Sequence, residues 1–228
     1  QSLRSSSEEA WVKLYRPHPH AANQQVSYYL KGAVLALVLD LHLRRQGSWL
    51  GAVLQELWGS HGRVRRGYRE VDLIGVLARH AADLETLLPQ WLGSTDDPPL
   101  AALLADVGLR LEPVASTTPT LGWQLEQRAG GGLWIERVQR GSAAQQAGLQ
   151  VGDELIALNN ERLRQKDDLE PLLRGQPRLE LLVCRDGLMR QLVVQLPAPQ
   201  PERWQLQVDD TAPTAAQQRR AAWLRLQP

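Results

Sequence analysis

Residues 140–156 read Arg-Gly-Ser-Ala-Ala-Gln-Gln-Ala-Gly-Leu-Gln-Val-Gly-Asp-Glu-Leu-Ile, and this stretch decides the fold of the C-terminal half of the chain. Its Gly152-Asp153 pair is a turn signal directly before an apolar run, 154–158, which predicts a strand. Asn159-Asn160 then predicts the next turn, because asparagine tolerates turn conformations.

Further short apolar runs lie on both sides of this stretch. Gly130-Gly131-Gly132 separates two of them and Asp186-Gly187 separates two more, so each of these turn signals predicts a hairpin. About five strands and two short helices, one of them at 167–173, are thus expected within about 80 residues. This content predicts a small α+β barrel or sandwich. The strands of the hairpins are expected at 123–126, 133–138, 179–185 and 189–196.

The run 140–156 resembles the PDZ family in the form found in bacterial proteases, where Gly-Ser, small residues and Ala-Gly-Leu precede Gly-Asp and an apolar strand. Leu121-Gly122-Trp123 falls where that family places its carboxylate-binding loop. Consecutive backbone N–H groups in such a glycine-containing turn form a nest for a carboxylate. The resemblance predicts a PDZ domain over 119–198 and a peptide that adds as an extra strand beside 123–127.

The helix that starts near Asp167 is expected to form the other wall of the groove. The expected peptide-binding residues are Leu121, Gly122, Trp123, Gln124, Leu125, Leu169, Leu172 and Leu173. The partner would be a peptide or a protein C-terminus. A second interpretation stays open, because fold does not fix function: the domain packs against or gates the upstream catalytic half of the same chain, and Trp123 is core.

The first 110 or so residues show helical periodicity, and no stretch there alternates like a strand. A first helix is expected after Ser5–Ser7, with Trp11, Leu14 and Tyr15 on it and Pro17 and Pro19 ending it. Asn23 is expected to cap a second helix that runs to about Arg45. Its centre, 33–39, is apolar all round, so this helix is expected to be buried. Shorter helices are expected at 50–58, 70–80, 84–92 and 100–107.

These patterns divide the chain into a helical subdomain at 1–112, a linker at 113–118, the PDZ domain at 119–198 and a tail at 199–228 with a helix near 215–224. The fold class is therefore α+β, with an all-helical N-terminal subdomain followed by a small β-rich domain. The only methionine is Met189, so we expect the sequence to begin within a longer protein.

Composition excludes some classes of partner. The net charge is +1, which gives no general attraction to nucleic acid or to an anionic membrane. One local cluster of basic residues has Gly62 and Gly67 among its arginines. It is therefore expected to be a solvated loop rather than a phosphate-binding patch, and it consists of Arg63, Arg65, Arg66 and Arg69. Cys184 is the only cysteine in the sequence, so no internal disulfide can form. The compartment, cytoplasmic or periplasmic in a bacterium, therefore stays open.

The helical half also resembles a known family. Trp11-Val12-Lys13-Leu14-Tyr15-Arg16-Pro17, then Asn23, then Ser27-Tyr28-Tyr29-Leu30-Lys31-Gly32-Ala33, is similar to the glycyl aminopeptidases. Those zinc metallopeptidases carry a thermolysin-like domain followed by a PDZ domain. The order of helical half, PDZ domain and tail matches the C-terminal half of that family, although His18-Pro19-His20-Ala21-Ala22 departs from its usual acidic approach to Asn23.

The zinc chemistry of that family needs His-Glu-x-x-His on a helix and a further carboxylate. This sequence has five histidines, and none is followed by glutamate. We therefore expect no metal site and no cofactor within these residues, and zinc in the full-length protein. The histidines are expected to be packing or surface residues: His18, His20, His42, His61 and His80.

The resemblance implies one catalytic residue. Related zinc aminopeptidases carry Tyr-Glu-Lys-Gly, whose tyrosine stabilises the oxyanion of the tetrahedral intermediate, and Tyr29-Leu30-Lys31-Gly32 matches it except at the glutamate. A phenol is a neutral donor near pH 7, which suits this task. The doubled tyrosine leaves Tyr28 as the alternative, and a third interpretation is that both are helix-packing aromatics.

The resemblance thus implies a C-terminal fragment of a zinc-dependent aminopeptidase, inactive by itself because its metal site lies elsewhere. The alternative is a non-catalytic PDZ adaptor with a helical docking domain, and a third reading is a fragment of a PDZ-bearing serine protease. A His-Glu-x-x-His motif upstream would favour the peptidase over the adaptor.

Overall fold

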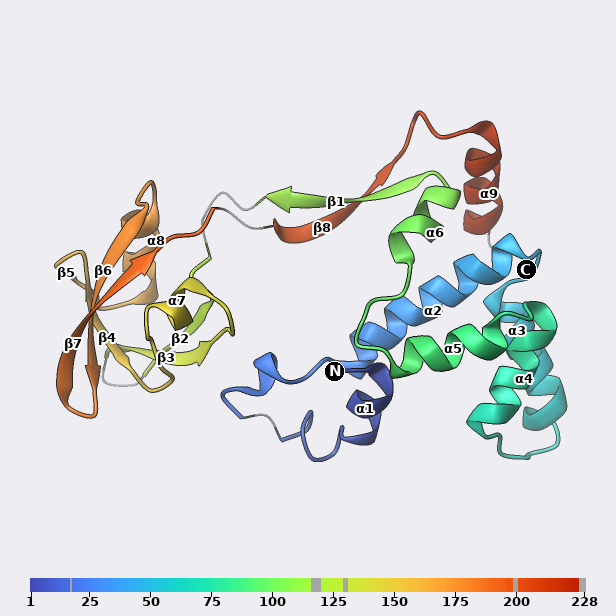
Figure 1. Ribbon diagram of the computed structural model, residues 1–228, viewed down its shortest axis with the longest axis horizontal. Coiled ribbons are helices and arrows are strands. Elements are labelled where there is room, and N and C mark those ends of the chain that lie inside the picture. The colour runs from blue at the N-terminus through green and yellow to red at the C-terminus, as the bar shows by residue number, and fades with distance from the viewer. Residues whose placement is uncertain (17, 116–119, 129–130, 199–200, 226–228) are drawn as a thin grey trace. The chain divides into compact units, whose positions relative to one another are not determined.

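The computed structural model describes residues 1–228 except 17, 116–119, 129–130, 199–200 and 226–228 (Figure 1). Expectations that concern Pro17, Pro119, Gly130, Pro199 and the linker at 116–118 lie outside the described residues. The chain divides into two compact units. The helical unit comprises residues 1–15, 25–112 and 205–228, and the β-rich unit comprises residues 16–24 and 113–204.

The helical unit is built around α2, the long blue helix in Figure 1. The shorter helices expected from the sequence are confirmed as α3, α4, α5, α6 and α9. No helix among the described residues combines the length and apolarity needed to cross a membrane. The helices are α1 (Leu3–Glu8), α2 (Tyr28–Arg45), α3 (Leu50–Leu57), α4 (Glu70–His80), α5 (Leu84–Gly93), α6 (Leu100–Asp106) and α9 (Thr214–Leu224), with a π-helical turn η2 (Trp58–Gly62) after α3.

Two apolar clusters meet along α2. Leu35, Leu39 and Leu43, each one turn apart, are buried in the cluster shared with α1, α3, α4 and α5. Val38 and Leu41 are buried in the second cluster, with residues of α6. Each buried leucine or valine contributes about 1.5–3 kcal/mol. The expectation that α2 is buried all round is wrong for its first turns, because Ala33, Val34 and Ala36 are exposed.

Two helix starts differ from expectation. The side chain of Ser2 accepts a hydrogen bond from Ser5 N and caps α1, which ends at Glu8. Trp11 therefore lies in a turn, with its side chain 80% exposed. The cap of α2 is Ser27, which accepts from Leu30 N, and not Asn23. The spacing of apolar residues predicted that helices are present here, but it did not identify the hydroxyls of Ser2 and Ser27 as their N-caps.

The β-rich unit contains a sheet in the order β2-β3-β4-β6-β7, with β5 paired to β4. Both expected hairpins are confirmed as β2–β3 and β6–β7. The second turns at Asp186 and Gly187, with φ of 52° and 79°, the combination that a two-residue hairpin turn requires. The strands are β2 (Trp123–Gln127), β3 (Leu133–Val138), β4 (Glu154–Leu158), β5 (Glu161–Arg162), β6 (Arg178–Arg185) and β7 (Leu188–Gln195), and the helices are η1 (Ala21–Asn23), α7 (Ala143–Gln146), η3 (Lys166–Asp168) and α8 (Leu169–Leu173).

A second, two-stranded sheet was not expected from the sequence. It pairs β1 (Leu109–Ala115) with β8 (Pro201–Val208). Pro113 and Pro201 argued against strands here, because proline cannot donate to the hydrogen-bond ladder of a sheet. It is tolerated mainly in edge strands or at the first residue of a strand. The chain passes from one unit to the other within each of these strands, between Glu112 and Pro113 in β1 and between Trp204 and Gln205 in β8.

One buried ion pair fixes the turn before β4. Asp153 is fully buried and receives hydrogen bonds from Arg185 Nε at 2.6 Å and from an Arg185 terminal nitrogen at 2.7 Å. The Asp153 carboxylate also accepts from Gln150 N at 2.9 Å. The aspartate of the Gly-Asp motif therefore joins the exit of α7 to the end of β6.

Candidate functional site

The loop before β2 can adopt its shape only with glycine at position 122. Gly122 has a φ of +71°, where other residues are strained. A Cβ at this position would lie 2.2 Å from the Cβ of Ser142. Ser142 cannot withdraw, because its hydroxyl donates to Gln139 O at 2.6 Å and accepts from Gln145 N as the cap of α7.

The carbonyl groups of this loop are anchored inside the β-rich unit. Gly122 O accepts from Gln139 N at 2.7 Å, and Leu121 O accepts from Ala144 N at 3.0 Å. The amides of Leu121 and Gly122 donate no hydrogen bond to any described residue. An anion-binding nest requires consecutive backbone N–H groups that are not already hydrogen-bonded, and the fixed carbonyl groups of this loop hold these N–H groups in position.

The strand that follows is an edge strand. Among the described residues β2 pairs with β3 alone, at one end of the sheet. Its other edge therefore offers backbone groups to a further strand.

The apolar residues expected in the groove meet in one cluster. Leu121, Leu125 and Leu169 are buried in it, and Trp123, Leu172 and Leu173 pack against it while half-buried. The structure thus brings the loop, β2 and α8 together. Gln124 is exposed on β2.

A surface hollow next to the loop lies on a different side from α8. It has a volume of about 410 Å³ and includes Gly122, Trp123 and Gln124, but its other residues belong to the end of β3 and to the segment around Asn23. None of the expected α8 residues lines it.

Asn23 has a role that the sequence did not suggest. Its Nδ2 donates to Val138 O at 2.7 Å, and its Oδ1 accepts from Arg140 N at 2.8 Å. The side-chain amide thus engages the backbone at the end of β3 as a neighbouring strand would. Residues 16–24 consequently belong to the β-rich unit.

The first turn of α2 carries the second candidate site. The hydroxyl of Tyr15 lies 2.6 Å from that of Tyr29 and 3.1 Å from that of Tyr28. The rings of Tyr28 and Tyr29 stack with centroids 4.2 Å apart. Tyr28 packs against the helical core, whereas the side chain of Tyr29 is 59% exposed. Sequence reasoning named Tyr28 and Tyr29 but missed Tyr15, because nothing in the sequence shows that its turn folds back onto α2.

The three phenols influence one another. The hydrogen bond from the Tyr15 hydroxyl, followed by that from Tyr28, lowers the pKa of Tyr29 by stabilising its phenolate. Hydrogen bonding to Tyr15 and then to Tyr29 raises the pKa of Tyr28, which keeps its proton. Tyr29 is thus the more acidic donor of the pair, and a more acidic phenol gives a stronger hydrogen bond to an anion.

Lys31 of the same motif holds α2 in place. Its ammonium group donates to the carbonyls of Ser94, Thr95 and Asp96 at 3.4, 3.3 and 3.5 Å. These residues directly follow α5, so a lysine two positions after Tyr29 ties the first turn of α2 to the end of α5.

Two of the five histidines each lie against a carboxylate. His42 Nε2 lies 3.0 Å from Asp83, and His80 bridges Ser48 at 2.7 Å and Glu56 at 2.8 Å. Arg79 and His80 together lower the pKa of Glu56. Within the part of the chain that the structure describes, no three His, Cys, Asp or Glu residues are grouped so as to hold a metal ion.

Comparison with known families and structures agrees with both resemblances. Residues 134–185 match the PDZ domain model, and residues 1–35 match the M61 glycyl aminopeptidase model. The crystal structure of an aminopeptidase N family protein from Idiomarina loihiensis matches 98% of this chain with 26% identity and a TM-score of 0.80. This chain resembles the glycyl aminopeptidases and carries a PDZ domain. The resemblance drawn from the sequence is thus confirmed, as is the α+β fold class.

The match to the Idiomarina protein covers 40% of that protein, so the chain spans less than half of its length. Two further structures also match, each over about a third of this chain. The PDZ domain of EpsC from Vibrio cholerae has 23% identity over 33% of this chain and 95% of its own, with a TM-score of 0.29. The serine endoprotease from Yersinia pestis has 20% identity over 36% of this chain and 29% of its own, with a TM-score of 0.31. No curated protein matches this chain.

Proposed function

We propose that this chain forms part of a zinc-dependent aminopeptidase, in which Tyr29 stabilises the oxyanion and the PDZ domain binds a peptide or covers the active-site cleft. The observation that carries the proposal is the match of 98% of the chain to an aminopeptidase N family structure. The segment that matches the M61 glycyl aminopeptidases, residues 1–35, contains all three tyrosines of the cluster.

The described residues do not fit a zinc site by themselves. His42 and His80 are each paired with a carboxylate, and no third ligand joins either pair. Zinc, as the Lewis acid of such a peptidase, would be held by residues outside these 228. The residues of this chain then act on the substrate rather than on the metal.

The phenol of Tyr29 has the properties that oxyanion stabilisation requires. It is exposed at the start of a helix that Lys31 anchors, and its hydroxyl is held by Tyr15. As a substrate carbonyl oxygen gains negative charge, the Tyr29 O–H donates to it. A donor that is already in place reorganises little during the reaction, which is why it stabilises the transition state more than the bound substrate.

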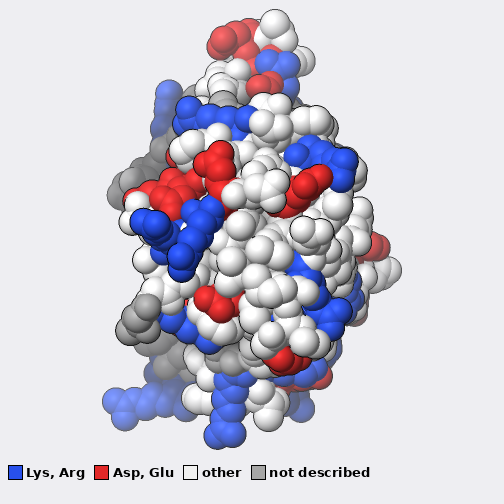
Figure 2. Space-filling view, turned by 90° about the vertical axis from the view of Figure 1, so that its left-hand side faces the viewer, with Lys and Arg blue, Asp and Glu red and all other residues white. Residues whose placement is uncertain are grey.

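The PDZ domain suits an extended peptide with a free carboxylate. The amides of Leu121 and Gly122 would receive the carboxylate, and the open edge of β2 would pair with the peptide backbone. Figure 2 views the molecule from the side on which Figure 1 shows β5, β6 and β7, and there basic and acidic side chains are interspersed.

The test is a comparison of Tyr29→Phe and Tyr28→Phe in the peptidase that contains this chain. We expect Tyr29→Phe to lower kcat about 100- to 1,000-fold with little change in KM, since the lost hydrogen bond forms only in the transition state. Tyr28→Phe serves as the matched control and should lower kcat far less. Zinc content, measured in parallel, should be equal in all three proteins. Unchanged turnover in Tyr29→Phe would remove Tyr29 from the mechanism.

A further inference from the structure

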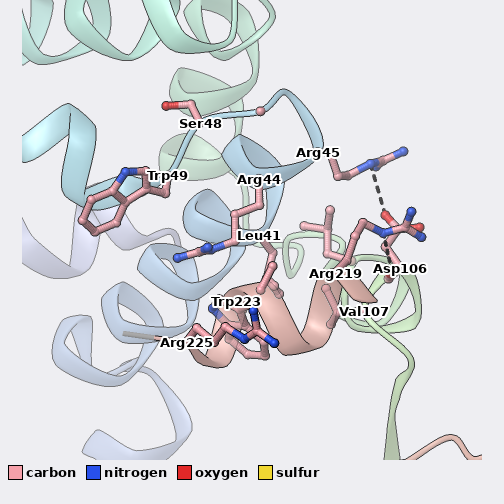
Figure 3. Close-up of a pocket in the computed structure, with 13 residues that line it drawn as sticks. Leu41, Arg44, Arg45, Ser48, Trp49, Asp106, Val107, Arg219, Trp223 and Arg225 are labelled. Atoms are coloured by element: carbon pink, nitrogen blue, oxygen red, sulfur yellow. Dashed lines mark hydrogen bonds and ion pairs between the residues drawn. The ribbon is translucent and has the colours of Figure 1, made fainter. Parts of the chain in front are cut away.

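A cavity of about 340 Å³ lies in the helical unit (Figure 3), and its lining includes none of the three clustered tyrosines. Residues of α2, α6 and α9 line it, as do those that lead into α3. Its apolar lining comes from Leu41, Leu103, Val107 and Trp223. The Trp223 ring is fixed because its Nε1 donates to Asp40 at 3.0 Å. This volume is near the lower end for small-molecule pockets.

Four arginines surround the same cavity, and Figure 3 shows that they come from opposite elements. Arg44 and Arg45 lie at the end of α2, whereas Arg219 lies on α9 and Arg225 directly follows it. Among the described residues, the carboxylates that pair with these four guanidinium groups are Asp40, beside Arg44, and Asp106, beside Arg45. The cavity therefore carries an excess of positive charge.

The arginines are anchored in a way that leaves their outer ends available. Arg44 Nε donates to Asp40 at 2.8 Å, and Arg219 Nε donates to Asp106 O at 2.8 Å. Arg45 Nε lies 3.1 Å from the Asp106 carboxylate. The terminal nitrogens of these three arginines donate no hydrogen bond to any described residue, and the guanidinium group of Arg225 makes neither a hydrogen bond nor an ion pair with one.

Guanidinium groups held by Nε present two parallel N–H donors, the arrangement that recognises phosphate and carboxylate groups bidentately. The apolar lining beside them cannot satisfy such donors, but it can bury hydrocarbon. A ligand that satisfies both parts must carry an oxyanion on an apolar body.

We propose that this arginine pocket binds a small molecule with an apolar body and a phosphate or carboxylate group. The oxyanion contacts the terminal nitrogens of Arg45, Arg225 and the other two arginines of the pocket. The apolar body of the ligand lies against Trp223 and Leu103. None of these residues belongs to the tyrosine cluster or to the PDZ groove, so the proposal is independent of the peptidase function.

The test follows the indole N–H resonance of Trp223 in the 228-residue chain by NMR. The probes are phenyl phosphate and 3-phenylpropionate, with inorganic phosphate and phenol as partial ligands. We expect saturable shifts with at least one of the two complete probes, weaker binding at higher ionic strength, and clearly weaker binding of both partial ligands. Tighter binding of phenyl phosphate identifies a phosphate as the natural head group, and tighter binding of 3-phenylpropionate identifies a carboxylate.

Two variants test the arginines. Arg45→Ala and Arg225→Ala should each weaken binding about threefold to tenfold, the range for one charge-assisted hydrogen bond at a partly exposed site. Arg66→Ala, an exposed arginine of the 63–69 loop, is the matched control and should bind as tightly as the wild type. The proposal is overturned if neither complete probe saturates up to about 10 mM, if phenol binds as tightly as phenyl phosphate, or if both pocket variants bind unchanged.

Discussion

The two units position their candidate functional groups by different means. In the β-rich unit the candidate carboxylate-binding donors are backbone amides of two consecutive residues, Leu121 and Gly122, and local geometry orients them. In the helical unit the candidate donor is the side chain of Tyr29, and its hydroxyl is held by Tyr15 from a separate segment. A site made of contiguous backbone is encoded locally, whereas a site made of distant side chains depends on tertiary packing.

The largest expected effect concerns the local framework of the β-rich unit. Asp153→Ala should destabilise this unit by about 3–5 kcal/mol, because it leaves the Arg185 guanidinium without its carboxylate partner in a mostly buried position, where Gly148 O still accepts from it. Chemical denaturation of the 228-residue chain, followed by circular dichroism, measures the change. The helical unit should keep its own transition.

Glu180→Ala is the matched control for that variant. It removes the Arg178–Glu180 ion pair, whose side chains are 52% and 59% exposed, in the same sheet. Exposed pairs contribute about 0–1 kcal/mol. Equal destabilisation by the two variants would contradict the structural role assigned to Asp153.

The next effect separates backbone strain from steric contact in the loop. Gly122→Ala and Gly141→Ala both place a side chain at similar φ, +71° and +73°, but only the Cβ at position 122 meets a neighbour. Strain alone costs about 1–2 kcal/mol. We therefore expect Gly141→Ala to lose about that amount and Gly122→Ala to lose more. Thermal unfolding measures both.

Peptide binding should distinguish the same two variants. In the wild type, C-terminal peptides titrated by NMR should shift the amides of residues 121–127, and Gly122→Ala should abolish these shifts while Gly141→Ala retains them. Absence of shifts in the wild type across a broad peptide library would instead favour the covering of the active-site cleft.

Asn23 gives a smaller effect. Asn23→Ala removes two hydrogen bonds to the end of β3 and should destabilise the β-rich unit by about 1–2 kcal/mol. Asn23→Asp keeps an oxygen that accepts from Arg140 N and replaces the donor to Val138 O with a second carboxylate oxygen. Hydrogen exchange at the Arg140 amide should accelerate in Asn23→Ala and stay slow in Asn23→Asp. Equal exchange in both would show that the segment is held by other contacts.

The same contrast explains what the sequence could predict. The glycine-rich motif and alternating strands predicted the β-rich unit, because turns such as Asp186-Gly187 are determined by a few adjacent residues. The shorter helices of the first half followed from periodicity. The pairings that join distant segments did not follow from periodicity, which is why Asn23 was expected to cap a helix and why β1 and β8 were missed. Tyr29 was found only through family resemblance, and its partner Tyr15 was not found.

The smallest expected effect is a pH shift within the tyrosine cluster. Because hydrogen bonding lowers the pKa of Tyr29 and raises that of Tyr28, phenolate absorbance of the chain should rise over a wide pH range, with Tyr29 ionising below and Tyr28 above the ordinary value of about 10. Tyr29→Phe should remove an early component. Persistence of that component in Tyr29→Phe would assign it to another residue.

Tyr15→Phe links this titration to activity. The Tyr15 hydroxyl is the largest cause of both shifts, so its removal should bring the two ionisations closer together. An oxyanion donor must keep its proton, and ionised Tyr29 would repel the developing charge. Activity of the peptidase should therefore fall as Tyr29 ionises, and Tyr15→Phe should move this alkaline limb to higher pH. A purely packing role for the cluster would change stability in Tyr15→Phe but would leave the alkaline limb of kcat where it is in the wild type.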